Sequence, residues 1–208
     1  VGKTTIVNRA CEGLSKLGIP TQGFYTEEVR EHGQRTGFDV VTLNGDRGPL
    51  ASIKTDGQAQ GRQYTVGKYN VRLTSFENTA IPSLISKYLN KPQQITFSGD
   101  YEYRIPFGCE AIALQGLPQE CTNPFLFFGK LEVTRVLKET IDLFSDKRSV
   151  IVIDEIGKME LFSQSFIRTV KDILDKPGTT VLATIPIAKG RPIPFVEEVR
   201  NRKDSCLF

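Results

Sequence analysis

The stretch Val150-Ile151-Val152-Ile153-Asp154-Glu155 decides the fold. Its four consecutive β-branched residues are too few for a helix and are typical of a strand buried on both faces of a parallel sheet. The two acids follow at the carboxyl end of that strand, which is the edge where α/β sheets bind ligands. A solvated turn whose acids cap the next helix is the alternative interpretation.

Strand-like and helical patterns alternate on either side of this stretch, which favours an α/β layered fold. Apolar residues at three- and four-residue spacing predict helices at 6–17, 131–144, 163–174 and 194–200, and a helix start at 74–77. Strands are predicted at 23–29, 37–43, 64–73, 150–153 and 180–185. The first two flank His32-Gly33-Gln34 and therefore predict a β-hairpin, and Asn44-Gly45 predicts a turn.

Residues 86–129 show no lasting period, and prolines interrupt short aromatic-rich pieces. We interpret them as an insert of loop or irregular β character within one domain that spans 1–208. The 208 residues suit one domain with an insert, at roughly 100–200 residues per domain.

Composition excludes several classes of protein. The net charge of +3 is spread over 27 basic and 24 acidic residues, so it indicates neither a nucleic-acid nor a membrane partner. No apolar run approaches the ~18 residues of a membrane span. The four cysteines are scattered, and His32 has no neighbouring ligand, so we expect reduced thiols, no structural zinc and a cytoplasmic location. The only methionine is Met159, so we expect the sequence to lack its true N-terminus.

The chain opens with the second half of a phosphate-binding pattern. Gly2-Lys3-Thr4-Thr5 at a helix start matches the end of G-x-x-x-x-G-K-[ST], the Walker A motif. Glycine admits a phosphate close to the backbone, and the helix N-terminus attracts its charge. The lysine can reach the β- and γ-phosphates, and the threonine hydroxyl can ligate Mg²⁺.

Together with this motif, Asp154 and Glu155 after the buried strand indicate a Walker B element. Asp154 at that edge can hold Mg²⁺, directly or through water, and Glu155 can orient or deprotonate an attacking water. The two motifs together indicate a nucleotide-hydrolysing site.

Several blocks resemble the THEP1-type nucleoside-triphosphatase family. They are Gly23 to Arg30, Gly37 to Leu43, Ile153 to Leu161, Thr184-Ile185-Pro186 with Lys189-Gly190, and Glu197 to Asp204. The resemblance covers about 1–85 and 147–204. It implies a P-loop NTPase fold of the RecA-like α/β type and Mg²⁺-dependent hydrolysis of ATP, GTP and other nucleoside triphosphates.

The resemblance also assigns site residues. It implies Lys3 on the phosphates, Thr4 and Asp154 in the metal shell, and Glu155 in water activation. The nucleotide-binding residues would be Val1, Gly2, Lys3, Thr4, Thr5, Val150, Ile151, Val152, Ile153, Asp154, Glu155, Ile156 and Gly157.

Two departures from the family pattern qualify these expectations. The family has a strand and G-P-P-G before Val1, and without them we expect nucleotide binding to be badly weakened. The family is expected to have no counterpart to about 86–145, and further strand and helix are expected after Phe208.

The sequence leaves the remaining roles open. Lys158, Lys189, Arg200 and Arg202 are candidates for a cation on the γ-phosphate or else surface charges. Arg30 and Glu27-Glu28 face the nucleotide or pair across strands. The insert aromatics stack a base or simply pack.

Two other activities compete with hydrolysis. A P-loop nucleotide or small-molecule kinase would need an acceptor site and usually an arginine-bearing lid, whereas between Arg72 and Arg135 the chain has Arg104 alone. A catalytically silent binding protein is the third. We expect a monomer whose partners are nucleoside triphosphates.

Overall fold

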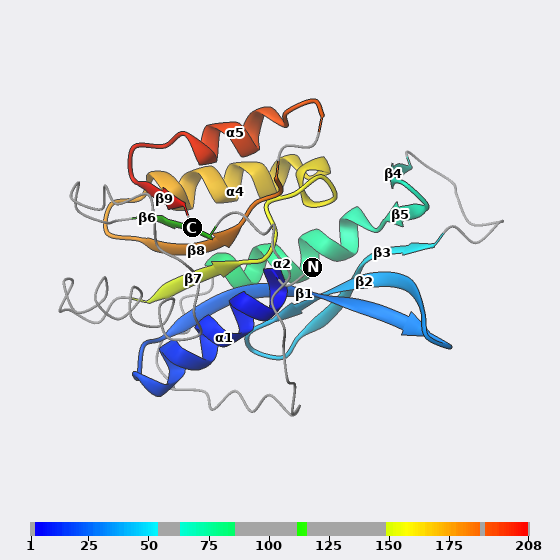
Figure 1. Ribbon diagram of the computed structural model, residues 1–208, viewed down its shortest axis with the longest axis horizontal. Helices are drawn as coiled ribbons and strands as arrows, with labels where there is room; N and C mark the ends of the chain where they lie inside the picture. Colours follow the sequence, from blue (N-terminus) through cyan, green and yellow to red (C-terminus); the bar gives the residue numbers. More distant parts are fainter. Residues whose placement is uncertain (1–2, 54–62, 86–111, 116–148, 188–189, 208) are drawn as a thin grey trace.

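The computed structural model describes residues 3–53, 63–85, 112–115, 149–187 and 190–207. Its helices are α1 (Lys3–Lys16), α2 (Leu73–Ile85), the 3-10 helix η1 (Glu160–Phe162), α4 (Gln164–Asp175) and α5 (Pro194–Arg200). Its strands are β1 (Thr21–Glu31), β2 (Gln34–Thr42), β3 (Arg47–Ile53), β4 (Tyr64–Val66), β5 (Tyr69–Val71), β6 (Ile112–Gln115), β7 (Val150–Ile153), β8 (Thr180–Thr184) and β9 (Ser205–Leu207). The strands form one sheet in the order β4-β5-β3-β2-β1-β7-β8-β6-β9 (Figure 1).

The sheet is parallel only at its centre. There β7 pairs in parallel with β1 and with β8, while every other pair among the described strands is antiparallel. The expectation of a parallel sheet embellished by one hairpin was therefore too narrow. Tight turns with positive φ at Gly33, Gly45 and Gly67 reverse the chain, and each reversal produces an antiparallel pair.

Glycine is required where β1 meets β7. Gly23 has a φ of +120°, and a Cβ there would lie 2.0 Å from the carbonyl oxygen of Val152. The absence of a side chain lets the two backbones pair, with Gly23 opposite Val152. This close approach holds the hairpin against the strand that carries Asp154.

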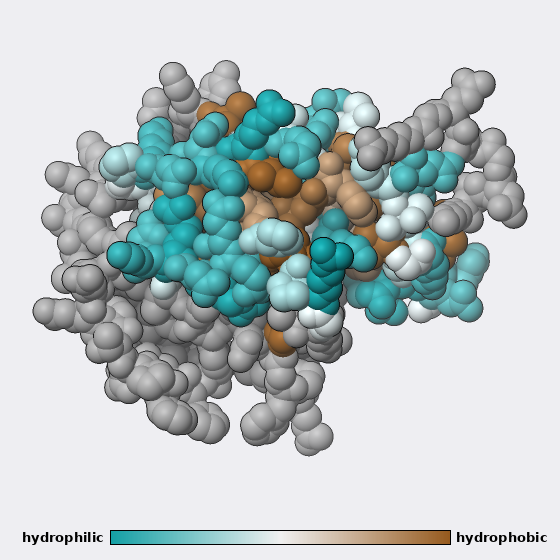
Figure 2. Space-filling view, turned by 90° about the horizontal axis from the view of Figure 1, so that it is seen from above, coloured by the Kyte–Doolittle hydropathy of each residue, from teal (hydrophilic) through white to brown (hydrophobic). Residues whose placement is uncertain are grey.

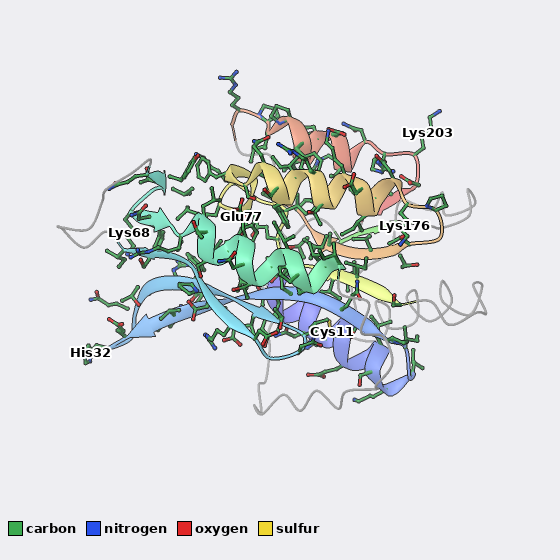
Figure 3. The ribbon with its side chains drawn as sticks, turned by 180° about the vertical axis from the view of Figure 1, so that it is seen from behind. Cys11, His32, Lys68, Glu77, Lys176 and Lys203 are labelled. Carbon is green, nitrogen blue, oxygen red and sulfur yellow. The ribbon has the colours of Figure 1, made fainter. Side chains whose placement is uncertain are left out.

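Helices cover both faces of the sheet. Figures 1 and 3 show α1 on one face and α2 with α4 on the other. The second face holds the main core, where the rings of Phe24, Phe76 and Phe166 have centroids 5.1–6.1 Å apart. All four residues of β7 are buried, as expected for a strand covered on both faces.

The face seen from above is largely polar (Figure 2). Seen from above, over α5 and α4, hydrophilic side chains surround a smaller apolar area near the centre of the face (Figure 2). No helix in the described ranges is long and apolar enough to span a membrane.

The sequence predictions hold for most elements and fail at several strands. The helices that begin at Lys3, Leu73, Gln164 and Pro194 and the strands β1, β2, β7 and β8 are confirmed. Strand β3 was missed, the strand expected at 64–73 divides at Gly67 into β4 and β5, and β6 and β9 were not predicted. Such short strands carry too few residues for a periodic pattern.

The predicted insert falls largely outside the described residues. Between 86 and 148 the structure describes only β6, which pairs with β8 and β9. The helix predicted at 131–144 and the insert aromatics lie outside that part, so the single-domain interpretation with an insert stays a prediction.

Candidate functional site

Asp154 is the centre of the site. It follows β7 directly, and its side chain is only 1% exposed. Because burying a carboxylate is costly without hydrogen bonds, its partners define its role. Three hydroxyls donate to it: Thr4 Oγ1 to Oδ2 at 2.7 Å, Thr184 Oγ1 to Oδ1 at 2.7 Å, and Thr26 Oγ1 to Oδ2 at 3.4 Å. The backbone N–H of Thr26 also donates to Oδ2, at 3.4 Å.

The bond between Thr4 and Asp154 joins the two sequence motifs, which are 150 residues apart. Thr4 lies in the first turn of α1, so the N-terminus of that helix reaches the carboxyl end of β7. The free N–H groups and the dipole of a helix N-terminus favour a bound anion. The Thr4 hydroxyl gives its proton to Asp154, which leaves its oxygen lone pairs available to a cation.

Sequence reasoning missed Thr26 and Thr184 as site residues. Thr184 ends β8, the strand next to β7, so its hydroxyl reaches the same edge of the sheet. A polar residue at the end of the buried run 180–185 was the available signal, and it is the signal that identified Asp154. Nothing in the sequence pattern of β1 distinguishes Thr26 from its polar neighbours.

Glu155 lies at the same edge and is half-buried. Its side chain turns over Gly157, because a Cβ built on Gly157 would lie 2.8 Å from Oε1 and 3.0 Å from Cδ of Glu155. Glu160, the first residue of η1, is 4% exposed. Burial, followed by the charge of Glu155, raises the pKa of Glu160 to about 8.

Most of the other predicted site residues lie in the part of the chain that the structure describes. Val1 and Gly2 lie outside the described residues, and Lys3 and Thr5 belong to the first turns of α1. Val150, Ile151, Val152 and Ile153 form β7, which supports the site from beneath. Ile156 and Gly157 are buried, and the Ile156 N–H donates to the carbonyl of Thr184 at 2.8 Å.

Two of the candidate γ-phosphate cations are already engaged. Arg202 Nη1 lies 2.8 Å from Asp175, and its Nε lies 3.0 Å from Asp204. Arg200 donates to the carbonyl of Pro186 at 2.9 Å. Both arginines join segments of the fold, while Lys158 is exposed and Lys189 lies outside the described part.

The charged residues of the hairpin form ion pairs with one another and with Arg47 on β3. Glu28 accepts from Arg30 on its own strand and from Arg35 across the hairpin, and Glu27 lies 2.8 Å from Arg47. Of the two interpretations offered for these residues, the structure shows the pairing. Figure 3 places His32 at the tip of the same hairpin.

The oxygen donors at this edge suit a hard cation. Mg²⁺ is usually held by one or two protein oxygens together with waters and substrate phosphates, which fits Thr4 and Asp154. The described residues hold no cluster of three or more His, Cys, Asp or Glu side chains for a metal held by protein alone. Cys11 is a free, buried thiol, and burial raises its pKa to about 12. It is therefore an inert part of the α1 packing.

Comparison with known proteins identifies the family. A family model described as NTPase matches residues 1–96 and 125–208. The chain belongs to this NTPase family. It is 40% identical to the human cancer-related nucleoside-triphosphatase, over the whole chain and 82% of that protein. It is 32% identical to the nucleoside-triphosphatase THEP1 of a Thermotoga species, over the whole chain and 79% of that protein.

Solved structures agree with the P-loop NTPase fold. The solution structure of a human cancer-related nucleoside triphosphatase superposes with a TM-score of 0.61 at 41% identity, covering 98% of this chain and 80% of that one. The crystal structure of THEP1 from Aquifex aeolicus gives 0.55 at 31% identity, covering 97% and 78%. The chain is thus a member of a family of nucleoside-triphosphate hydrolases.

The family match corrects one expectation. We expected no family counterpart to residues 86–145, yet the family model matches 86–96 and 125–145. Only 97–124 lies between its two matched parts. The expectation was wrong because it rested on a few recognisable blocks within 1–85 and 147–204, whereas the family model also matches residues between those blocks.

Proposed function

We propose that this NTPase-family chain hydrolyses ATP, GTP and other nucleoside triphosphates to the diphosphate and phosphate, with Mg²⁺. The observation that supports this most directly is the 2.7 Å hydrogen bond from Thr4 to Asp154. It joins the N-terminus of α1, suited to phosphate, to the carboxylate edge of the sheet, suited to a cation and a water.

Each residue then has a distinct task. Lys3, at the first position of α1, binds the phosphates, and Thr4 and Asp154 hold Mg²⁺, with the buried Asp154 acting through the Thr4 hydroxyl or a bound water. When bound there, Mg²⁺ would supply positive charge that offsets the negative charge of the phosphates. Glu155 accepts a hydrogen bond from the attacking water and orients it towards the γ-phosphate.

The proposed catalysis consists of positioning and charge stabilisation, without a covalent intermediate. The fixed hydroxyls around Asp154 keep the metal-side oxygens in place before substrate arrives. The half-buried Glu155 keeps contact with water beside the buried Asp154. Action as a monomer in the cytoplasm stays a prediction.

The test is phosphate release from Mg·ATP and Mg·GTP by the purified chain, with and without EDTA. We expect release that EDTA abolishes and that Lys3→Ala and Glu155→Gln each lower by at least about 100-fold. Thr169→Val, on the outer helix α4, is the control and keeps wild-type release.

Two results would overturn the proposal. Transfer of phosphate only in the presence of an added nucleoside or sugar acceptor identifies a kinase. Absence of nucleotide binding, measured by titration calorimetry with Mg·ATP, identifies a silent protein.

A further inference from the structure

We propose that Gly157 and Glu160 are positioning residues that set the place of the Glu155 carboxylate. This inference rests on the function proposed above, in which Glu155 orients the attacking water. It concerns how the segment after β7 holds a side chain that the family's activity would need in one place.

The first observation is the space above Gly157. Three atoms of Glu155 lie where a side chain on residue 157 would begin: Oε1 at 2.8 Å, Cγ at 2.9 Å and Cδ at 3.0 Å from an ideal Cβ. Real Cβ atoms essentially never approach a neighbour closer than 3.0 Å, so a Cβ on residue 157 would force the Glu155 side chain or the turn to shift. Gly157 does not have a positive φ, so the turn itself does not require glycine. Glycine at this position leaves the Glu155 side chain where it lies.

The second observation is the buried carboxyl of Glu160. It is 4% exposed, and it lies at the start of η1, one turn after Gly157, where the backbone N–H groups of Glu160 itself and of Gly157 favour its ionised form and so lower its pKa against the larger effect of burial. A carboxyl is rarely buried unless its hydrogen bonds offset the cost. The turn bond from the Leu161 N–H to the carbonyl of Gly157, at 3.0 Å, places Glu160 beside the residue over which Glu155 lies.

Backbone hydrogen bonds hold the segment around Gly157 in place on two sides. The Leu161 N–H donates to the carbonyl of Gly157 at 3.0 Å, and the Ser163 N–H donates to the carbonyl of Glu160 at 3.0 Å. The Ile156 N–H donates to Thr184 on β8. The backbone at residues 156 and 157, over which the Glu155 side chain lies, is therefore bonded to η1 on one side and to the sheet on the other.

A carboxylate that orients a water depends on a rigid backbone beneath it, because the rate depends on its position. A displacement of about 1 Å in a catalytic group can cost 10²-fold in rate, even when substrate binding is unchanged. Because Gly157 has no side chain, the Glu155 side chain can occupy the space above it. We infer that the buried Glu160 holds Gly157 in its position.

The first experiment is a double-mutant cycle on thermal stability. Gly157→Ala forces a Cβ against Glu155 and is expected to lower Tm by ~2–4 °C or more in a chain of this size. Glu155→Ala removes Oε1, Cγ and Cδ, so Gly157→Ala in that background is expected to lower Tm far less. Equal losses in the two backgrounds would overturn the inference. This cycle requires no enzymatic activity.

The second experiment separates kcat from KM for Mg·GTP. Gly157→Ala is expected to lower kcat by about 100-fold and to leave KM within about twofold, because the phosphate-binding residues are untouched. Gly48→Ala is the matched control. Gly48 lies on β3, and a Cβ there would lie 2.3 Å from Oγ1 of Thr79 on α2, so this variant also introduces a close contact but does not involve Glu155. It is expected to lower Tm and to keep kcat. A kcat for Gly157→Ala no lower than that of Gly48→Ala would contradict the inference.

Glu160 is tested by a pair of variants. Glu160→Gln keeps the size of the side chain and an acceptor oxygen beside Gly157 and is expected to retain most of kcat, whereas Glu160→Ala removes both and is expected to lower kcat at unchanged KM. Equal kcat in the two variants would overturn the role of Glu160. A wild-type chain that hydrolyses no triphosphate would remove the proposed function, while the Tm cycle would still decide the contact.

Discussion

Thr4 is the residue whose side chain joins the two halves of the site, since its hydroxyl donates to Asp154. Valine has nearly the same shape and no hydroxyl, so Thr4→Val removes this bond with little change in packing. We expect kcat/KM for Mg·ATP to fall by about 100-fold and the Mg²⁺ concentration at half-maximal rate to rise. Steady-state phosphate release over a Mg²⁺ series measures both.

The control is Thr169→Val on α4, where a hydroxyl bonded to the carbonyl of Ser165 is lost away from the site. It is expected to leave the rate and the Mg²⁺ dependence unchanged. An unaltered Mg²⁺ dependence in Thr4→Val would argue against Thr4 in the metal shell.

Glu160 gives the molecule a defined pH dependence of stability. Burial and the charges of Glu155 and Asp154 raise its pKa from 4.5 to about 8. The folded state therefore holds this proton more tightly than the unfolded state. The resulting stabilisation is complete below about pH 4.5 and is lost as the pH rises to about 8. At ~1.4 kcal/mol for each pKa unit, the effect is on the order of a few kcal/mol.

Glu160→Gln cannot ionise, so its stability lacks this slope. We expect the Tm of the variant relative to wild type to increase as the pH rises from 5 to 8, because wild type alone must ionise a buried carboxyl. Thermal melts at intervals of half a pH unit measure the difference. Parallel Tm curves would refute the prediction.

At the scale of elements, Ser163 joins two helices. Its hydroxyl accepts from the Phe166 N–H at 2.9 Å as the N-cap of α4, and it donates to Glu77 Oε1 on α2. Figure 3 shows Glu77 on α2, which lies next to α4. One hydroxyl thus starts α4 and fixes it against α2.

Ser163→Ala loses the cap and the contact with α2 together. We expect the free energy of unfolding to fall by about 1–2 kcal/mol, measured by urea denaturation. Ser165→Ala, exposed in the first turn of the same helix, is expected to change it by less than about 0.5 kcal/mol. Similar losses in the two variants would contradict the dual role of Ser163.

At the scale of the whole molecule, Arg202 ties the described C-terminal segment to the rest. It bonds Asp175 at the end of α4, the carbonyl of Leu174, and Asp204 just before β9. Both aspartates are more than a third exposed, so solvent screens these ion pairs and each contributes little. The hydrogen bond to the carbonyl of the buried Leu174 is shielded from solvent better than the two ion pairs are.

Arg202→Ala is expected to lower the unfolding free energy by about 1 kcal/mol and to leave kcat unchanged, in contrast to Lys3→Ala. Urea denaturation and phosphate release on the same preparation test both halves. A large loss of kcat with normal stability would restore Arg202 as a γ-phosphate cation.

Local patterns were enough to predict the central strands and most helices. The β-branched run 150–153 and the spacing of 163–174 carry their own period, so β7 and α4 follow from neighbouring residues. Strands β4, β5, β6 and β9 have three or four residues each, and they exist only because an adjacent strand offers hydrogen bonds.

By itself, the sequence determined which polar side chains stand at the edge of the sheet. A threonine at a helix start and two acids after a buried strand are local features, because capping and burial act over a few residues. Only the tertiary structure decided that Thr26 and Thr184 meet Asp154, that Glu155 lies over Gly157, and that Glu160 is buried. These contacts depend on strand order, register and side-chain packing, which the whole core sets through residues far apart in the chain.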